Sequence, residues 1–147
     1  MISRRRILAW GAAAPLMLQV RPAWATPETM QAALEAFTGG ATMQEGGIEL
    51  RIPLLIESGN AVPMAVFVDS PMTDDDHVEA IAVFNEQNPL PEVVTFHFTA
   101  LSGRAEAETR IRLSATQNVH AVARMSDGSF RHAATDIIVT APACIEE

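Results

Sequence analysis

Cysteine is almost missing from this sequence, and its scarcity excludes several kinds of small protein. The 147 residues contain one cysteine, Cys144, so no intrachain disulfide framework or cysteine-rich zinc module can form. Tyrosine and lysine are absent. Charged residues make up only 19% of the chain against 48% hydrophobic residues, which argues against a disordered protein. The length suits one domain that can bury enough surface to fold without disulfides or a structural metal.

Positive charge is also scarce and is unevenly placed. All ten basic residues are arginine, and four of them lie in the first 25 residues, which contain no acidic residue. The formal net charge is −8 overall, but the 6 remaining basic residues against 18 acidic residues give −12 after position 25. Such an acidic balance disfavours binding to nucleic acid or to an anionic membrane, because phosphate binding needs clustered cations.

Residues 1–25 are predicted to be a cleaved export signal. Arg4–Arg6 precede an apolar run over Ile7–Val20, and Ala23–Ala25 fit a signal-peptidase site. The apolar run is shorter than the roughly 20 residues that span a bilayer. The arginines favour the twin-arginine route over an ordinary secretion signal, so we expect a mature chain from about Thr26 in the bacterial periplasm. Both tryptophans lie in this segment, and loss of absorbance at 280 nm would report its removal.

The rest of the chain is predicted to be an immunoglobulin-like antiparallel β-sandwich over residues 26–140. Pro27–Phe37 has apolar residues at helical spacing and is followed by two glycines, which predicts one short N-terminal helix. From Ile48 onward the apolar period becomes two. About seven strands are expected, near Ile48–Ile52, Val62–Val68, Ala80–Asn85, Val93–Thr99, Ala105–Leu113, Asn118–Met125 and Arg131–Thr140.

Two local patterns support this assignment. Within Ala105–Leu113, charged residues occupy alternate positions and apolar residues occupy the others, which predicts one solvated and one buried face. Ser126–Ser129 contains a glycine that can take positive φ, and it predicts a tight turn between the last two strands.

Candidate catalytic or metal-binding residues are few. The histidines His77, His97, His120 and His132 show no metal-ligand spacing, and we expect them to be scattered surface or structural residues. Asp74–Asp76 could bind a divalent cation with His77, but a solvated turn is the favoured interpretation. No phosphate-binding loop, nucleophile elbow or carboxylate pair is recognisable. We therefore expect no cofactor and no resident metal, and an independent metalloenzyme is the least favoured hypothesis.

Cys144 stands out because of its position beyond the last predicted strand, in the tail 141–147. Chain termini are commonly exposed, and an exposed unpaired thiol in an oxidising compartment invites disulfides and adducts. One interpretation is a thiol kept for covalent chemistry. The other is an incidental cysteine, or one packed on the sandwich through its neighbour Ile145. Position alone does not decide between them, and it also leaves open a disulfide-linked homodimer.

Six short blocks of the sequence carry a family resemblance: Val68–Thr73, Thr95–Thr99, Ser102–Glu106, Thr109–Leu113, Thr116–Val119 and Ala123–Gly128. In this order they resemble SoxY, the family of sulfur-carrier subunits in bacterial thiosulfate oxidation. The resemblance runs from the export signal to the last strand. It implies an immunoglobulin-like sandwich, a periplasmic location and a heterodimer with a SoxZ-like subunit.

The resemblance also implies a function for Cys144 as the covalent carrier of the substrate. In the family, a c-type cytochrome joins thiosulfate oxidatively to the carrier cysteine, a dimanganese hydrolase releases sulfate, and a molybdenum–haem enzyme oxidises the remaining sulfane sulfur. The carrier itself catalyses nothing. We therefore expect a periplasmic carrier of thiosulfate or a related sulfur species.

The C-terminal tail departs from the family pattern. The family ends in Gly-Gly-Cys-Gly-Gly, whereas no glycine occurs between Pro142 and Glu147. Proline stiffens the approach to the cysteine, Ile145 is bulky, and the two terminal glutamates place negative charge near the sulfur. This departure favours an alternative hypothesis, a SoxY-like binding or assembly module that keeps the partner interface but has lost the carrier chemistry.

Overall fold

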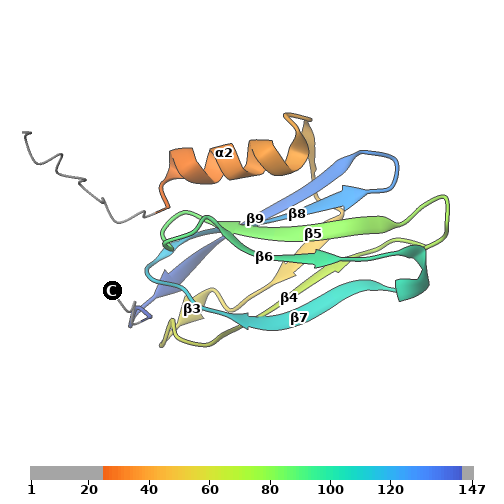
Figure 1. Ribbon diagram of the computed structural model, residues 1–147. Coiled ribbons are helices and arrows are strands. Elements are labelled where there is room, and N and C mark those ends of the chain that lie inside the picture. The colour runs from red at the N-terminus through yellow and green to blue at the C-terminus, as the bar shows by residue number, and fades with distance from the viewer. Residues whose placement is uncertain (1–24, 144–147) are drawn as a thin grey trace, which may run out of the picture.

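A computed structural model describes residues 25–143, and its one α-helix in that range is α2, Pro27–Thr38 (Figure 1). Thr26 and Thr29 form a capping box: the Thr29 amide donates to Thr26 Oγ1 at 3.3 Å, and the Thr26 amide donates to Thr29 Oγ1 at 2.7 Å. Pro27 occupies the first turn, and Gly39 ends the helix at φ 65°, a conformation that favours glycine. The predicted helix is confirmed to within one residue.

Two sheets pack face to face, and together they contain nine strands within residues 25–143 (Figure 1). The larger sheet has the order β1-β9-β8-β5-β6, and β3 also pairs with β9. The smaller sheet has the order β2-β4-β7. The strands are β1 (Met43–Glu45), β2 (Ile48–Arg51), β3 (Leu55–Ile56), β4 (Val62–Val68), β5 (Val78–Asn85), β6 (Glu92–His97), β7 (Ala105–Ile111), β8 (Gln117–Met125) and β9 (Phe130–Val139), with a 3-10 turn η1 at Ala100–Ser102.

The immunoglobulin-like sandwich is confirmed, and the seven predicted strands correspond to β2 and β4 to β9. The two additional strands, β1 and β3, are three and two residues long, and both pair in parallel with β9. Segments this short show no alternation of polar and apolar residues. Only their contact with β9 makes them strands, so the sequence pattern could not reveal them.

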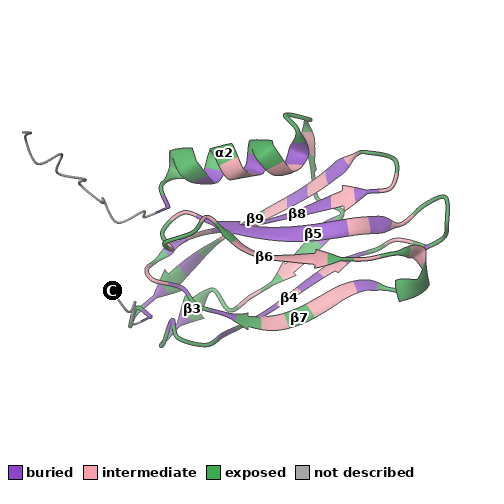
Figure 2. Cartoon of the chain, viewed as in Figure 1, coloured by how far each residue is buried: buried purple, intermediate pink, exposed green. Residues whose placement is uncertain are grey.

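Most of the core lies between the two sheets, where alternate residues of β4 are buried, and Figure 2 marks buried stretches on strands of both sheets. Val66 of β4 and Ile81 of β5 are fully buried there. β5 is buried along nearly its whole length, since its other face lies under α2. On that face Phe84 meets Leu34 of the helix, and Phe37 lies edge-on to Phe84 with ring centroids 5.9 Å apart. The helix therefore closes a second, smaller core on the outside of the larger sheet.

The outer face of the smaller sheet is charged, as the alternation in Ala105–Leu113 predicts. Arg51 of β2 contacts Glu106 of β7 at 3.6 Å, and Arg104 contacts the same carboxylate at 3.1 Å. Both guanidinium groups lie about 6 Å from the centre of the Phe67 ring. This face is solvated and carries surface ion pairs, each of which contributes little to stability.

None of the helices in residues 25–143 is long and apolar enough to cross a membrane. The predicted export signal falls on residues 1–24 and on Ala25, and all of it but Ala25 lies outside the described residues. That assignment stays a prediction.

Candidate functional site

The predicted carrier residue, Cys144, lies one position beyond the described residues, but the segment that leads to it is described. This segment is hydrogen-bonded on both sides. The Ala143 amide donates to the Leu113 carbonyl at 3.1 Å, the Gly59 amide donates to the Ala141 carbonyl at 2.8 Å, and the Leu113 amide donates to the Gly59 carbonyl at 2.9 Å. We call Gly59, Leu113, Ala141 and Ala143 the C-terminal anchor.

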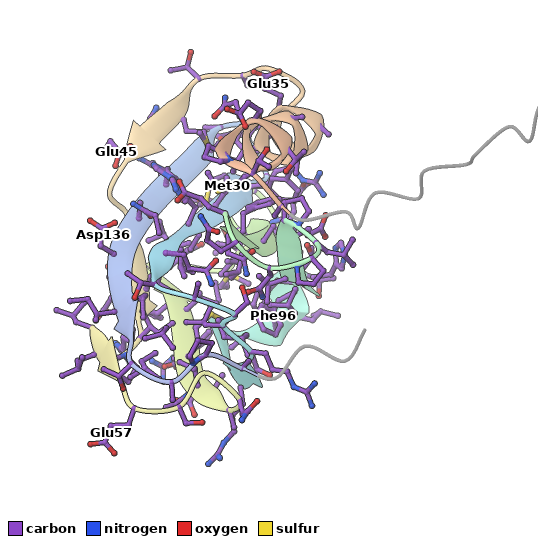
Figure 3. The ribbon with its side chains drawn as sticks, turned by 90° about the vertical axis from the view of Figure 1, so that its left-hand side faces the viewer. Met30, Glu35, Glu45, Glu57, Phe96 and Asp136 are labelled. Carbon is purple, nitrogen blue, oxygen red and sulfur yellow. The ribbon has the colours of Figure 1, made fainter. Side chains whose placement is uncertain are left out.

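The anchor follows directly from the end of β9. Thr140 donates its amide to the Ile56 carbonyl at 2.9 Å, and the Val139 amide donates to Thr116 Oγ1 at 3.0 Å. Residues 139–143 are thus bonded to β3 and the segment after it on one side and to the β7–β8 connection on the other. Figure 3 shows Glu57, the exposed neighbour of this region, at the end of the molecule opposite the helix.

The β7–β8 connection is itself held in place by side chains of the β5–β6 connection. Asn88 donates Nδ2–H to the Arg112 carbonyl at 2.8 Å and accepts from the Ser114 amide at 3.1 Å. Ser114 Oγ donates to the Gln87 carbonyl at 2.7 Å. Leu113, which these bonds flank, is fully buried in the core. The acceptor for the Ala143 amide is therefore part of a rigid region.

Gly59 is required by close packing within the anchor. An added Cβ at this position would lie 2.1 Å from the Leu113 carbonyl oxygen and 2.8 Å from the Ala143 nitrogen. Contacts this short do not occur, and both atoms belong to the backbone. The sequence predicts only a turn at Ser58–Asn60, and the close approach of Leu113 and Ala143 comes from the tertiary structure.

A chain of two histidines and a glutamate occupies the outer face of the larger sheet. His120 Nδ1 lies 2.9 Å from His132 Nε2, and His132 Nδ1 lies 2.6 Å from Glu45 Oε1. The two rings stack with centroids 5.1 Å apart. His132 is buried, whereas Glu45 is exposed on β1, which Figure 3 shows at the same end of the molecule as the helix. With Glu45 ionised, His132 donates Nδ1–H to the carboxylate, and its Nε2 accepts from His120 when both rings are neutral.

Burial lowers the pKa of His120 below its ordinary value, and a positive charge on His132 lowers it too. The Glu45 and Asp136 carboxylates act in the opposite direction. Desolvation is the larger effect, because a charged imidazole loses favourable hydration when it is partly buried. The arrangement ties strand β1 to the sheet through side chains as well as through the backbone.

This chain of residues corrects the expectation that the histidines are scattered. In the β8–β9 hairpin His120 lies opposite Ala134, so His132 is its diagonal neighbour on the same face. The turn at Ser126–Ser129 could have suggested this register, but Glu45 is brought in by the parallel pairing of β1 with β9, which no sequence pattern indicates.

The Asp74–Asp76 segment is an exposed turn, as the favoured interpretation states. Thr73 organises it: the Asp76 amide donates to Thr73 Oγ1 at 3.1 Å, and His77 Nδ1 lies 2.9 Å from the Thr73 carbonyl. Within residues 25–143, no three His, Cys, Asp or Glu side chains are placed to hold a metal ion. His97, at the end of β6, is exposed and distant in sequence from the other histidines.

The sequence of this chain matches no curated protein, but its structure matches several solved structures. In the structural comparison, the sulfur carrier protein SoxY from Chlorobium limicola f thiosulfatophilum matches with a TM-score of 0.64 and 25% identity, over 77% of this chain and 97% of that chain.

Two further matches show the fold alone. The putative superoxide reductase from Thermotoga maritima has a TM-score of 0.57 and 17% identity, over 66% of this chain and 93% of its own. The superoxide reductase (neelaredoxin) from Ignicoccus hospitalis has a TM-score of 0.57 and 16% identity, over 78% and 94%.

The family models agree with the first of these matches. The model of the sulfur oxidation protein SoxY matches residues 34–144, which include α2 from Leu34, all nine described strands, the C-terminal anchor and, at its last position, Cys144. This covers far more than half of the chain and agrees with the resemblance carried by the six sequence blocks. The chain belongs to the SoxY family of sulfur oxidation proteins.

Proposed function

We propose that this protein is a sulfur carrier that holds a thiosulfate-derived group covalently on Cys144 and presents it to partner enzymes. The observation that carries the proposal is the family match over residues 34–144, which reaches the chain's one cysteine. The name of the Chlorobium protein, sulfur carrier protein SoxY, supports the same function. In this proposal the chain has no catalytic activity of its own.

The loading step is an oxidation. The Cys144 thiol loses its proton, its sulfur forms a disulfide bond with the terminal sulfur of thiosulfate, and two electrons leave. A c-type cytochrome partner accepts these electrons one at a time. Hydrolysis by a second partner then breaks the bond between the sulfane sulfur and the sulfonate group: water supplies the oxygen, sulfate leaves, and a persulfide remains on Cys144. A third partner oxidises that sulfane sulfur.

The partners and the location belong to the same proposal. Family membership supports association with a SoxZ-like subunit and work in the periplasm. The net charge of −12 after position 25 makes long-range attraction to a cationic partner surface favourable, and this attraction should weaken as salt increases.

The test is the mass of the exported protein after exposure to thiosulfate in the periplasm of its host. We expect a mass increase of one thiosulfate-derived group that a reducing thiol removes, and no increase in the Cys144→Ser variant. The proposal fails if no thiol-reversible adduct forms and a strain with Cys144→Ala oxidises thiosulfate at the normal rate.

The glycine-free tail favours one alternative, the binding or assembly module without carrier chemistry. Affinity capture distinguishes this hypothesis from the carrier hypothesis. If the Cys144→Ser variant retains a SoxZ-like partner and also supports thiosulfate oxidation, the binding-module hypothesis is correct. If the variant retains the partner but thiosulfate oxidation stops, the carrier hypothesis is correct.

A further inference from the structure

Strand β6 ends the larger sheet, because β5 pairs with it on one side and no strand of the described range pairs with it on the other (Figure 1). The Phe98 amide donates to the Glu79 carbonyl of β5 at 2.9 Å, and bonded and non-bonded positions alternate along an antiparallel ladder. Thr95 and His97 therefore direct their N–H and C=O groups away from β5. No backbone hydrogen bond from elsewhere in residues 25–143 reaches these groups.

The side chains of β6 that face the core are incompletely covered as well. Val94 and Phe96 pack against the main core but stay half-buried. Ile81, the partner of Phe96 on β5, is fully buried, because β5 has a strand on each side. A further strand beside β6 would remove apolar surface of Val94 and Phe96 from water, which is favourable.

The middle of β6 also lacks the features that protect a free strand edge. Proteins protect such edges with charged residues, prolines or very short strands. Beyond a bulge at its start, β6 runs in regular register with β5, and Val93–Phe96 contains neither a charged residue nor a proline. By contrast, the edge strand β7 of the smaller sheet carries Glu106, Glu108 and Arg110, and the far edge of the larger sheet is covered by the short strands β1 and β3.

The charge of the domain selects the kind of strand that fits this edge. After position 25 the chain has a net charge of −12, so two copies repel each other and a cationic segment is attracted. Beside β6 the local charges are balanced, because Glu92 and Arg112 line the same shallow groove of about 320 Å³. Leu90, which is 70% exposed, lines this groove too and offers an apolar contact next to the strand.

From these observations we propose that β6 is a docking edge for an extended segment of a partner protein, which adds a strand to the larger sheet and carries basic residues at its ends. The outward backbone groups of Thr95 and His97 bond to the backbone of the segment, and its alternate apolar side chains cover Val94 and Phe96. This inference is independent of the chemistry proposed for Cys144, and its test needs neither the thiol nor a sulfur compound.

The probe is a synthetic peptide of alternating valine and threonine with an arginine at each end, added to the isotope-labelled protein. We expect the NMR signals of the Thr95 and His97 amides to shift and their hydrogen exchange to slow. Two further peptides carry N-methyl groups on the odd or on the even residues. One of them loses the donors that face β6 and should bind about tenfold more weakly. Glutamate ends should weaken binding at low salt but not at high salt.

Two results of the peptide experiment would overturn the proposal. The first is an absence of shifts at β6 with the arginine-ended peptide. The second is equal binding by that peptide and by both N-methylated versions, since pairing through the backbone requires the N–H donors of one face.

A variant of the protein tests the same edge from the other side. Thr95→Pro removes one outward N–H and no bond to β5, and proline is tolerated at such positions of edge strands. It should weaken peptide binding about tenfold, while the matched control Thr95→Ser, which keeps the N–H and the hydroxyl, binds like the wild type.

Two measurements complete the test. If circular dichroism shows that Thr95→Pro disturbs the fold, hydrogen exchange of the wild-type protein decides: protection of the Thr95 and His97 amides by the peptide supports the proposal, and its absence overturns it. Sedimentation without peptide examines self-association. A wild-type dimer that Thr95→Pro abolishes would show that a second copy occupies the edge, and would overturn the assignment to a basic partner.

Discussion

Replacement of Gly59 by alanine should destabilise the domain by more than the replacement of any glycine in an open turn. The backbone at Gly59 does not have the positive φ that disfavours alanine. The obstacle is steric: the new Cβ would lie 2.1 Å from the Leu113 carbonyl oxygen and 2.8 Å from the Ala143 nitrogen. Neither atom can move without moving the backbone, so the tail and the β7–β8 connection must separate.

The magnitude follows from the hydrogen bonds that this separation breaks. Three backbone bonds meet at the anchor, at 2.8, 2.9 and 3.1 Å. A typical intramolecular hydrogen bond contributes about 1 kcal/mol net, so the loss of all three lowers the free energy of unfolding by about 3 kcal/mol. With a urea dependence of about 1.5 kcal/mol per molar, the midpoint of unfolding should fall by about 2 M.

The control is Gly103→Ala. Gly103 has φ 73° and nothing within 4 Å of its would-be Cβ, so alanine there meets only the backbone penalty of about 1 kcal/mol. Because both tryptophans lie in the predicted export signal, unfolding of the mature chain is best followed by far-UV circular dichroism. A midpoint for Gly59→Ala equal to or above that of Gly103→Ala would refute the packing argument.

Two further predictions concern the outer face of the larger sheet. Since the pKa of His120 is lowered from 6.5 in the folded protein, the unfolded chain binds the proton more readily than the folded chain does. The stability that this shift contributes is complete above about pH 6.5 and is lost as the pH falls through the lowered pKa. Urea midpoints should therefore fall less between neutral and mildly acidic pH in His120→Asn than in the wild type. The exposed control His97→Asn should show the same change of midpoint with pH as the wild type. The same change in all three proteins would contradict a lowered pKa of His120. Leu34→Ala should lower the free energy of unfolding by about 3 kcal/mol, because Leu34 is only 3% exposed on the face of α2 that packs on the sheet. The control Leu101→Ala, at 96% exposure, should change it by less than about 0.5 kcal/mol. Comparable losses in the two variants would show that α2 does not stabilise the sheet.

Much of the fold could be predicted from local patterns. A first-turn proline, apolar residues at helical spacing and two glycines fixed the bounds of Pro27–Thr38 to within one residue. Alternation of polar and apolar residues located the seven longer strands, because a strand with one buried face must repeat every two residues. The six blocks that resemble SoxY indicated the family, and the match over residues 34–144 confirms it.

The candidate site was predicted only in part. Cys144 was identified by its isolation in the sequence and by the family resemblance, and its function as a carrier stays a proposal. The histidine chain was missed, since His132 meets Glu45 across 87 positions of sequence. Sequence spacing reports neighbours on one element, and it does not report which elements pair.

The amino-acid sequence by itself determined the sandwich class, the helix, the acidic balance of the main domain and the presence of a single cysteine, because these depend on composition and on short-range periodicity. Only the tertiary structure decided that β1 and β3 run beside β9, that the His120 and His132 rings lie within hydrogen-bond distance, and that Gly59 and Leu113 hold Ala143 against the domain. Each of these depends on strand register or on backbone contact between distant segments. Such contacts are selected by the packing of the whole core and leave no repeat in the sequence.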